Sequence, residues 1–185
     1  MLDDTSGIHA EMWEIRLRHE AGVHTIDHGS MLDEEGARLL KEKGAYFAPT
    51  LYVGHTILND NQALNIPAHQ VERERAMQGT QEKAFRLALD RQLPIVFATD
   101  AGVFPHGENA REFKLRVGLG QAPMAAIESA TRVAAEAIGW TDRVGTIQPG
   151  KFADLIAVAR DPLADITELE RVQFVMKGGT VYKTR

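Results

Sequence analysis

The sequence predicts an α/β fold that is built on a parallel sheet. Short runs rich in β-branched and aromatic residues alternate with stretches of helical period, which is the pattern of strand–helix–strand units. Three such runs are predicted strands: Val23–His28, Ala45–Leu51 and Pro94–Asp100. The first and the third end at a polar residue that is followed closely by a glycine. Because parallel strands place their carboxyl ends on one rim of the sheet, we expect these polar residues on the same side.

The stretches between and after these runs carry helix signals. Leu32–Lys43 begins with acidic residues, ends with lysines and is followed by Gly44, as expected of an amphipathic helix with a glycine cap. The stretch from Tyr52 to Pro67 has no period and is predicted to be a long loop or lid. The other predicted helices are Ala10–Glu20, Ala68–Gln92, which Gly79-Thr80 could divide, Ala110–Val117 and Met124–Ile138.

The pattern changes to β structure near the C-terminus. Gly145–Val158 is predicted to be a turn that leads into a strand, and Val172–Lys183 to be a hairpin. Its two-residue Gly178-Gly179 turn can supply the positive φ angles that such hairpins need. The sequence therefore predicts an α/β part over residues 1–142 and a small β appendage over residues 143–185.

Length and composition exclude several classes of protein. The 185 residues are too few for a complete (β/α)8 barrel, which needs about 250. The 21 basic residues are outnumbered by 26 acidic ones and form no basic block, so we expect no nucleic-acid partner. With no cysteine in the chain, disulfides and thiolate ligands are excluded, and any metal would be held by His, Asp or Glu.

Neither a membrane span nor a signal peptide is expected. No segment approaches 18 consecutive apolar residues, and the first residues lack a basic region followed by an apolar one. The compartment stays open on sequence grounds, and it would be the cytoplasm if Met1 is the true start of the protein.

Two strand-end residues, His28 and Asp100, are the main candidates for chemistry. An imidazole and a carboxylate that meet on one rim would suit a divalent metal such as zinc, whose bound water becomes a nucleophile near neutral pH. The alternative for His28 is a hydrogen bond in the core or a loop. The alternative for Asp100 is a cap on the following loop or helix.

Four further residues are candidates for a substrate pocket. Tyr52 and His55 follow the second predicted strand and are expected to face the same rim. His106 and Asn109 lie in the loop after Asp100, where they could reach a substrate or only order the loop by hydrogen bonds.

Several stretches, in this order, resemble the C-terminal half of the metal-dependent amidohydrolase superfamily. The nearest branch is the group of imidazolonepropionase-like proteins and Xaa-Pro dipeptidases (prolidases), and the resemblance covers residues 21–183. It implies the C-terminal part of a (β/α)8 barrel, about strands six to eight, with a small β segment of the accompanying sandwich. The stretches are Gly22-Val-His-Thr-Ile-Asp-His-Gly29, Phe97-Ala-Thr-Asp-Ala-Gly102, Ser129-Ala-Thr131 with Ala134-Ala135, and Gly145-Thr-Ile-Gln-Pro-Gly-Lys-Phe-Ala-Asp-Leu155.

The resemblance also implies an activity and a set of ligands. Family members use one or two zinc ions, or another divalent metal, to hydrolyse an amide or related C–N bond. By position, His28 resembles the metal ligand after the sixth strand, and Asp100 resembles the carboxylate after the eighth, which contacts the metal and takes the proton of the attacking water. His9 is the nearest counterpart of the fifth-strand histidine, but its spacing to His28 is about one residue short and Thr5-Ser-Gly-Ile8 beside it is a poor strand, which favours a surface role slightly. The ligands of the first and fourth strands have no counterpart in this chain.

Two functions of different class follow. The first is the C-terminal portion of a metal-dependent amidohydrolase that acts on a dipeptide or another small amide and is inactive until the barrel is completed. The second is a non-catalytic α/β module that binds or assembles, because a partial barrel leaves unpaired strand edges. The expected partners are a small-molecule or dipeptide substrate, with either a second copy of the chain or a missing N-terminal half.

Overall fold

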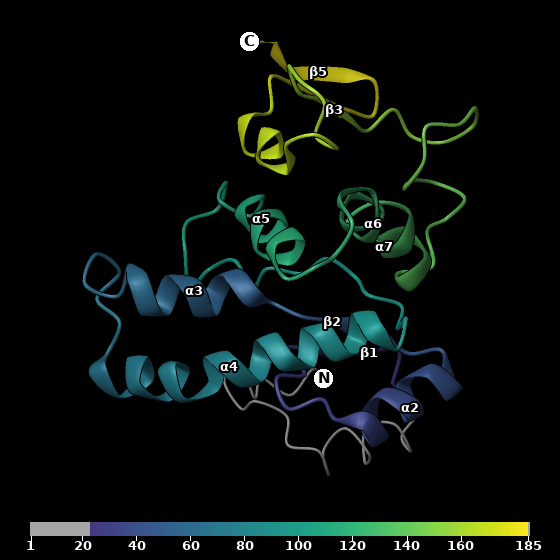
Figure 1. Ribbon diagram of the computed structural model, residues 1–185. Helices are drawn as coiled ribbons and strands as arrows, with labels where there is room; N and C mark the ends of the chain where they lie inside the picture. The colour runs from purple at the N-terminus through teal and green to yellow at the C-terminus, as the bar shows by residue number, and fades with distance from the viewer. Residues whose placement is uncertain (1–22, 185) are drawn as a thin grey trace.

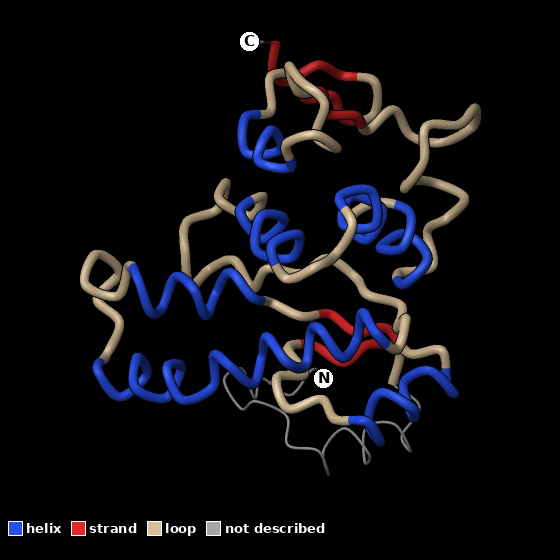
Figure 2. The backbone as a smooth tube through the Cα atoms, in the orientation of Figure 1, coloured by secondary structure: helices blue, strands red, loops and turns tan. Residues whose placement is uncertain are grey.

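The computed structural model describes residues 23–184 (Figures 1 and 2). They form two small sheets, with helices around the N-terminal sheet and between the two sheets. The N-terminal sheet lies among α2, α3 and α4, and the C-terminal sheet lies at the far end of the molecule, beyond α5, α6 and α7 (Figure 1). The predicted helix Ala10–Glu20 lies outside the described residues.

The N-terminal sheet is parallel, as predicted. Strands β1 (Thr25–Asp27) and β2 (Tyr46–Ala48) pair with Ile26 opposite Phe47, and Phe47 also forms a parallel bridge to Ile95. The predicted strand Pro94–Asp100 is wrong in extent, because only Ile95 pairs with β2. The chain turns away after this bridge, since the next N–H along it, that of Phe97, donates to the carbonyl of Ser129 instead (3.0 Å).

Helices α2 and α4 cover this sheet and form its core. In α2 (Glu34–Lys43), Asp33 caps the first turn through the N–H of Gly36 (2.8 Å) and Gly44 ends the helix at a φ of 65°, as predicted. Helix α4 (Ala68–Asp90) is continuous, so Gly79-Thr80 does not divide it. The buried apolar side chains of these helices and strands form one cluster, including Ile26, Leu40, Phe47, Phe85, Ala88 and Ile95.

The predicted loop after the second strand is wrong, because its first half is helix α3 (Leu51–Asn59). The N-terminal N–H groups of α3 are capped by a distant side chain, since Glu112 accepts hydrogen bonds from Leu51 (3.3 Å) and Tyr52 (2.6 Å). Gly54 then lets α3 approach α4 closely, because a Cβ there would lie 2.2 Å from the Glu74 carboxylate. Burial raises the pKa of Glu74 at this contact.

Three short helices, α5 (Arg111–Gly118), α6 (Pro123–Ser129) and α7 (Arg132–Ala137), separate the two sheets. The single helix predicted over Met124–Ile138 is therefore wrong. It divides at Ser129, where the carbonyl accepts from Phe97 and the hydroxyl donates to the carbonyl of Ala126 (2.7 Å).

The β appendage forms as predicted. Strands β3 (Leu155–Ala157), β4 (Phe174–Lys177) and β5 (Thr180–Thr184) make an antiparallel sheet, and Gly178 and Gly179 turn the hairpin at φ angles of 56° and 81°. A 3₁₀ helix, η1 (Ile166–Arg171), packs this appendage against α5. The boundary at residue 142 stays a prediction. Across residues 23–184, the helices are too short or too polar to cross a membrane.

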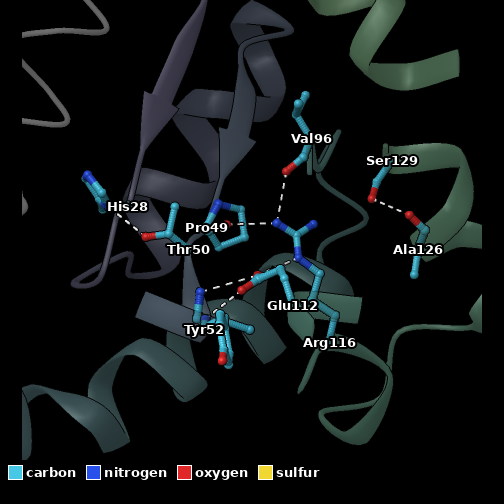
Figure 3. A network of polar contacts seen from close by, with 10 residues as sticks. His28, Pro49, Thr50, Tyr52, Val96, Glu112, Arg116, Ala126 and Ser129 are labelled. Carbon is cyan, nitrogen blue, oxygen red and sulfur yellow. Dashed lines mark hydrogen bonds and ion pairs between the residues drawn. The ribbon is translucent and has the colours of Figure 1, made fainter. Parts of the chain in front are cut away.

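A buried ion pair on α5 holds the ends of the strands together (Figure 3). Arg116 donates to Glu112 (2.7 Å), to the Pro49 carbonyl after β2 (2.8 Å) and to the Val96 carbonyl after the Ile95 bridge (3.2 Å). Both charged side chains have no exposed surface, and the guanidinium lies 4.7 Å from the ring centroid of Phe97. The pair therefore fixes where two parallel strands end and where α3 begins.

We expect Arg116→Met to lower the free energy of unfolding by about 3–5 kcal/mol, because it leaves the Glu112 carboxylate buried without its cation. Arg132→Met is the matched control. Arg132 pairs with Glu136 (2.7 Å) on the surface, where such a pair contributes less than about 1 kcal/mol. Urea unfolding followed by circular dichroism measures both variants. Equal stabilities for the two would show that the buried pair does not hold the fold.

Candidate functional site

Each of the two predicted site residues follows a segment of the parallel sheet. His28 follows β1 and Asp100 follows the strand segment at Ile95, and both strands run parallel to β2. Both residues have left-handed backbone, with φ angles of 62° and 55°, and they are two of the four non-glycine residues with positive φ in the described part of the chain. This conformation costs about 1–2 kcal/mol for residues with a side chain, and such strain collects at functional sites.

The turn at His28 is held from several sides. The N–H of His28 donates to the carbonyl of Ala48 (3.0 Å), which continues the pairing with β2. Gly29 follows at a φ of 53°, and a Cβ there would lie 2.4 Å from the Phe47 ring, so only glycine fits between strand and ring. The imidazole Nδ1 lies 2.7 Å from the hydroxyl of Thr50 (Figure 3). The hydrogen bond described for the ring is made by Nδ1, and the charge of Glu74 acts on His28.

Asp100 is exposed at the start of a loop that is ordered by its own residues. Asn109 donates to the hydroxyl of Thr99 (3.0 Å) and accepts from the N–H of Gly107 (3.1 Å). Asn109 therefore orders this loop, which is one of the two roles predicted for it. Its contact with a substrate stays a prediction. Within the described residues, the Asp100 carboxylate accepts no hydrogen bond, so it caps neither this loop nor the next helix.

Tyr52 and His55 lie on α3 rather than in a loop. The buried Tyr52 hydroxyl donates to Glu108 (2.8 Å) and accepts from Arg111 (2.9 Å), and its ring meets the edge of Phe104 at 4.7 Å. These contacts tie α3 to the loop after Asp100. The exposed His55 ring stacks on Tyr52 with a centroid distance of 5.9 Å. Tyr52 thus joins α3 to this loop, and the His55 side chain is exposed. The pocket roles of both residues stay predictions.

His106 and His9 complete the set of predicted residues. His106 is exposed in the loop after Asp100, and the described residues give it no hydrogen bond. His9 lies outside the described residues, so its role as a metal ligand stays a prediction.

Sequence reasoning missed the residues that support this site. Thr50 had no signal beyond its place at the end of the second strand. Glu112 and Arg116 are four residues apart in a predicted helix, which usually indicates an exposed pair. Their burial follows from tertiary packing that the local pattern does not report.

The chemistry of the donors fits part of a metal site. Imidazole nitrogen and carboxylate oxygen are ligands that zinc accepts, and a catalytic zinc usually has three protein ligands. Over residues 23–184, no group of three His, Asp or Glu side chains is arranged to hold a metal. The roles of His28 and Asp100 as metal ligands stay predictions.

Comparison with known proteins shows what the chain is similar to. The family model of the amidohydrolase family matches residues 5–182. Among curated proteins, ochratoxinase from Aspergillus niger is 31% identical over 169 residues, which are 89% of this chain and 35% of that protein.

Solved structures share the fold. A Xaa-Pro dipeptidase with methionine bound in its active site is 37% identical, with a TM-score of 0.86 over 92% of this chain and 42% of that one. A prolidase in complex with N-methylphosphonate-L-proline is 28% identical, with a TM-score of 0.85 over 94% of this chain and 43% of that one. The chain thus spans less than half the length of these relatives.

The 2.7 Å contact between Nδ1 and the Thr50 hydroxyl is compatible with a hydrogen bond in either direction. A ligand role for Nε2 requires Nδ1–H to donate, and we expect Thr50 to hold the His28 ring in this tautomer. Thr50→Ser keeps this acceptor and should keep one dominant tautomer, protonated on Nδ1. Thr50→Val has the same shape without the oxygen and should give a mixture of tautomers. The ¹⁵N chemical shifts of the ring, measured by NMR, distinguish these states. Identical shifts in Thr50→Val and the parent chain would contradict the assignment.

Proposed function

The chain belongs to the amidohydrolase family. On this premise we propose that it supplies part of the active site of a metal-dependent hydrolase that cleaves an amide, peptide or cyclic C–N bond. The observation that carries the proposal is that His28 and Asp100, both with left-handed backbone, follow segments that pair in parallel with β2. Their meeting at one rim belongs to the proposal. Family membership supports hydrolase chemistry in general. The metal, the substrate and the roles of these two residues belong to the proposal.

Each residue has a distinct task in the proposed reaction. Members of the family generally bind divalent metals, and a bound zinc ion supplies an acidified water and polarises the scissile carbonyl. His28 would hold the metal through Nε2, with Thr50 fixing the orientation of the ring. Asp100 would take the proton of the attacking water and return it to the nitrogen of the leaving amine. Its exposure and its lack of a described hydrogen-bond partner leave the carboxylate free for this transfer.

The proposed substrate class is a dipeptide or another small N-acyl compound. Two of the solved relatives are a Xaa-Pro dipeptidase and a prolidase that binds a proline phosphonate. The loop that follows Asp100 is held rigid by Asn109 and by the Tyr52 contacts, which suits a pocket for a compact substrate. This likeness supports the proposal, and the test below includes substrates outside the proline dipeptides.

A non-catalytic binding or assembly module is the second candidate. The observation that favours it is the edge of the parallel sheet, where Ile95 pairs with β2 on one side alone within residues 23–184. The two candidates differ in whether completion of the barrel produces turnover.

We expect the purified 185-residue chain to hydrolyse neither Xaa-Pro dipeptides nor N-acyl amino acids when zinc is added, because two ligands rarely retain zinc. The same chain joined to the N-terminal portion of the Xaa-Pro dipeptidase should show zinc-dependent turnover of one of these substrates. Release of free amino acid, measured by chromatography, follows both reactions. Turnover by the chain alone would contradict the prediction that the barrel must be completed before catalysis. An inactive but folded fusion would favour the binding module.

In that fusion, we expect Asp100→Asn to lower kcat by about 10²–10⁴-fold with little change in KM, because the amide keeps the shape but cannot take a proton. Asp142→Asn is the matched control, since its side chain is 75% exposed and far along the chain from the rim. A kcat for Asp100→Asn equal to that of the control would remove Asp100 from the proton transfer.

A further inference from the structure

Thr50 stands at the start of helix α3 but does not cap it. A threonine at this position usually accepts a hydrogen bond through its hydroxyl from the second or third N–H of its own helix. Thr50 is buried, and its side chain makes no such bond. Its hydroxyl lies instead 2.7 Å from Nδ1 of the His28 ring (Figure 3). The hydroxyl therefore contacts the ring and not the helix.

Glu112 on α5 caps α3 in place of Thr50. Its carboxylate accepts from the N–H of Tyr52 at 2.6 Å and from the N–H of Leu51 at 3.3 Å. The Tyr52 N–H is the second of the helix, so it is one of the two that the Thr50 hydroxyl would otherwise bind. A hydrogen bond to an ionised acceptor is about twice as strong as one between neutral groups. The carboxylate therefore wins this N–H from the hydroxyl.

Arg116 holds both the carboxylate and the residue before Thr50. It donates to Glu112 (2.7 Å) and to the carbonyl of Pro49 (2.8 Å), and neither charged side chain is exposed to solvent. The backbone is thus bonded to one ion pair on both sides of Thr50, at Pro49 before it and at Leu51 after it. The ion pair therefore fixes the backbone from which the Thr50 side chain projects (Figure 3).

We propose that Glu112 is a positioning residue for His28. By capping α3, the carboxylate keeps the Thr50 hydroxyl on the imidazole, and the hydroxyl in turn sets the tautomer of the ring. Without the carboxylate, the hydroxyl turns to the N–H of Tyr52 and the ring loses its partner at Nδ1. This inference rests on the proposed function, in which His28 holds a metal through Nε2, and it adds a residue on α5 that acts on that ligand through Thr50.

The test compares two double variants that differ in the acceptor at position 112. Both carry Arg116→Met, so neither leaves a cation buried without its partner. Glu112→Leu removes the acceptor, whereas Glu112→Gln keeps a carboxamide oxygen on a side chain of the same length and is the matched control. The readout is the ¹⁵N chemical shifts of the His28 ring in the metal-free chain at alkaline pH, where histidine side chains are neutral. Thr50→Val is the reference for a ring that has lost the hydroxyl.

We expect Glu112→Leu/Arg116→Met to shift the tautomer ratio toward that of Thr50→Val, with a several-fold larger fraction of the minor tautomer than in the parent chain. Glu112→Gln/Arg116→Met should keep the parent ratio. Leu40→Ala should keep it too, although it opens a cavity in the core, because loss of stability alone does not move the Thr50 hydroxyl. A purely structural role for Glu112 predicts no difference between the two double variants.

Glu112→Asp keeps both charges and shortens the side chain, which withdraws the carboxylate from α3. It should shift the ratio in the same direction, and it replaces Glu112→Leu/Arg116→Met in the comparison if circular dichroism shows that the double variant does not fold.

The proposal is overturned if the variant without the cap keeps the parent ratio, or if Glu112→Gln/Arg116→Met or Leu40→Ala departs from it by as much. It is also overturned if Thr50→Val keeps the parent ratio, since the hydroxyl then does not set the ring. Failure of the proposed function is a separate outcome. It would appear as a folded fusion without turnover, whereas these shifts are measured on the 185-residue chain without metal or substrate.

Discussion

The buried Glu112–Arg116 pair is the interaction on which the rest of the structure depends. Burial raises the pKa of Glu112 and lowers that of Arg116, and the attraction between the two charges acts against both shifts. A buried pair of this kind is not by itself a strong source of stability. Its role here is geometric. Arg116 donates to the carbonyls of Pro49 and Val96, and Glu112 accepts from the first N–H groups of α3. The strand ends and the helix that follows them are therefore fixed by α5.

This dependence explains which elements could be predicted from sequence. Helix α2 carries its own start and stop signals in Asp33 and Gly44, and the hairpin carries its own turn in Gly178-Gly179, so both follow from local patterns. Helix α3 has no capping bond from Thr50 and takes its cap from a residue about sixty positions away, so no local window reports it. The division of α6 from α7 and the short pairing at Ile95 have the same origin. In each case a backbone group bonds to a partner on another element.

The candidate site shows the same division between what local sequence reports and what tertiary contacts add. His28 and Asp100 are candidates because they follow apolar runs and precede glycines, and each follows a segment that pairs in parallel with β2. Their meeting at one rim stays a prediction. The pocket residues Tyr52 and His55 were predicted on a loop and lie on a helix. Thr50 could not be found from sequence, since its importance is its distance to the His28 ring and not its pattern.

The parallel sheet and Asp100 are linked through one segment of chain. Ile95 pairs with β2 at the start of the segment, and Asp100 stands five residues further along. Among the described residues, hydrogen bonds tie Val96 to β2 and Arg116, Phe97 to Ser129, and Thr99 to Asn109. The left-handed backbone of Asp100 is strained. A residue keeps such a conformation only where the contacts around it hold it in place. The bonds of Phe97 to Ser129 and of Asn109 to Thr99 therefore restrain the position of the proposed base as well as the end of the strand.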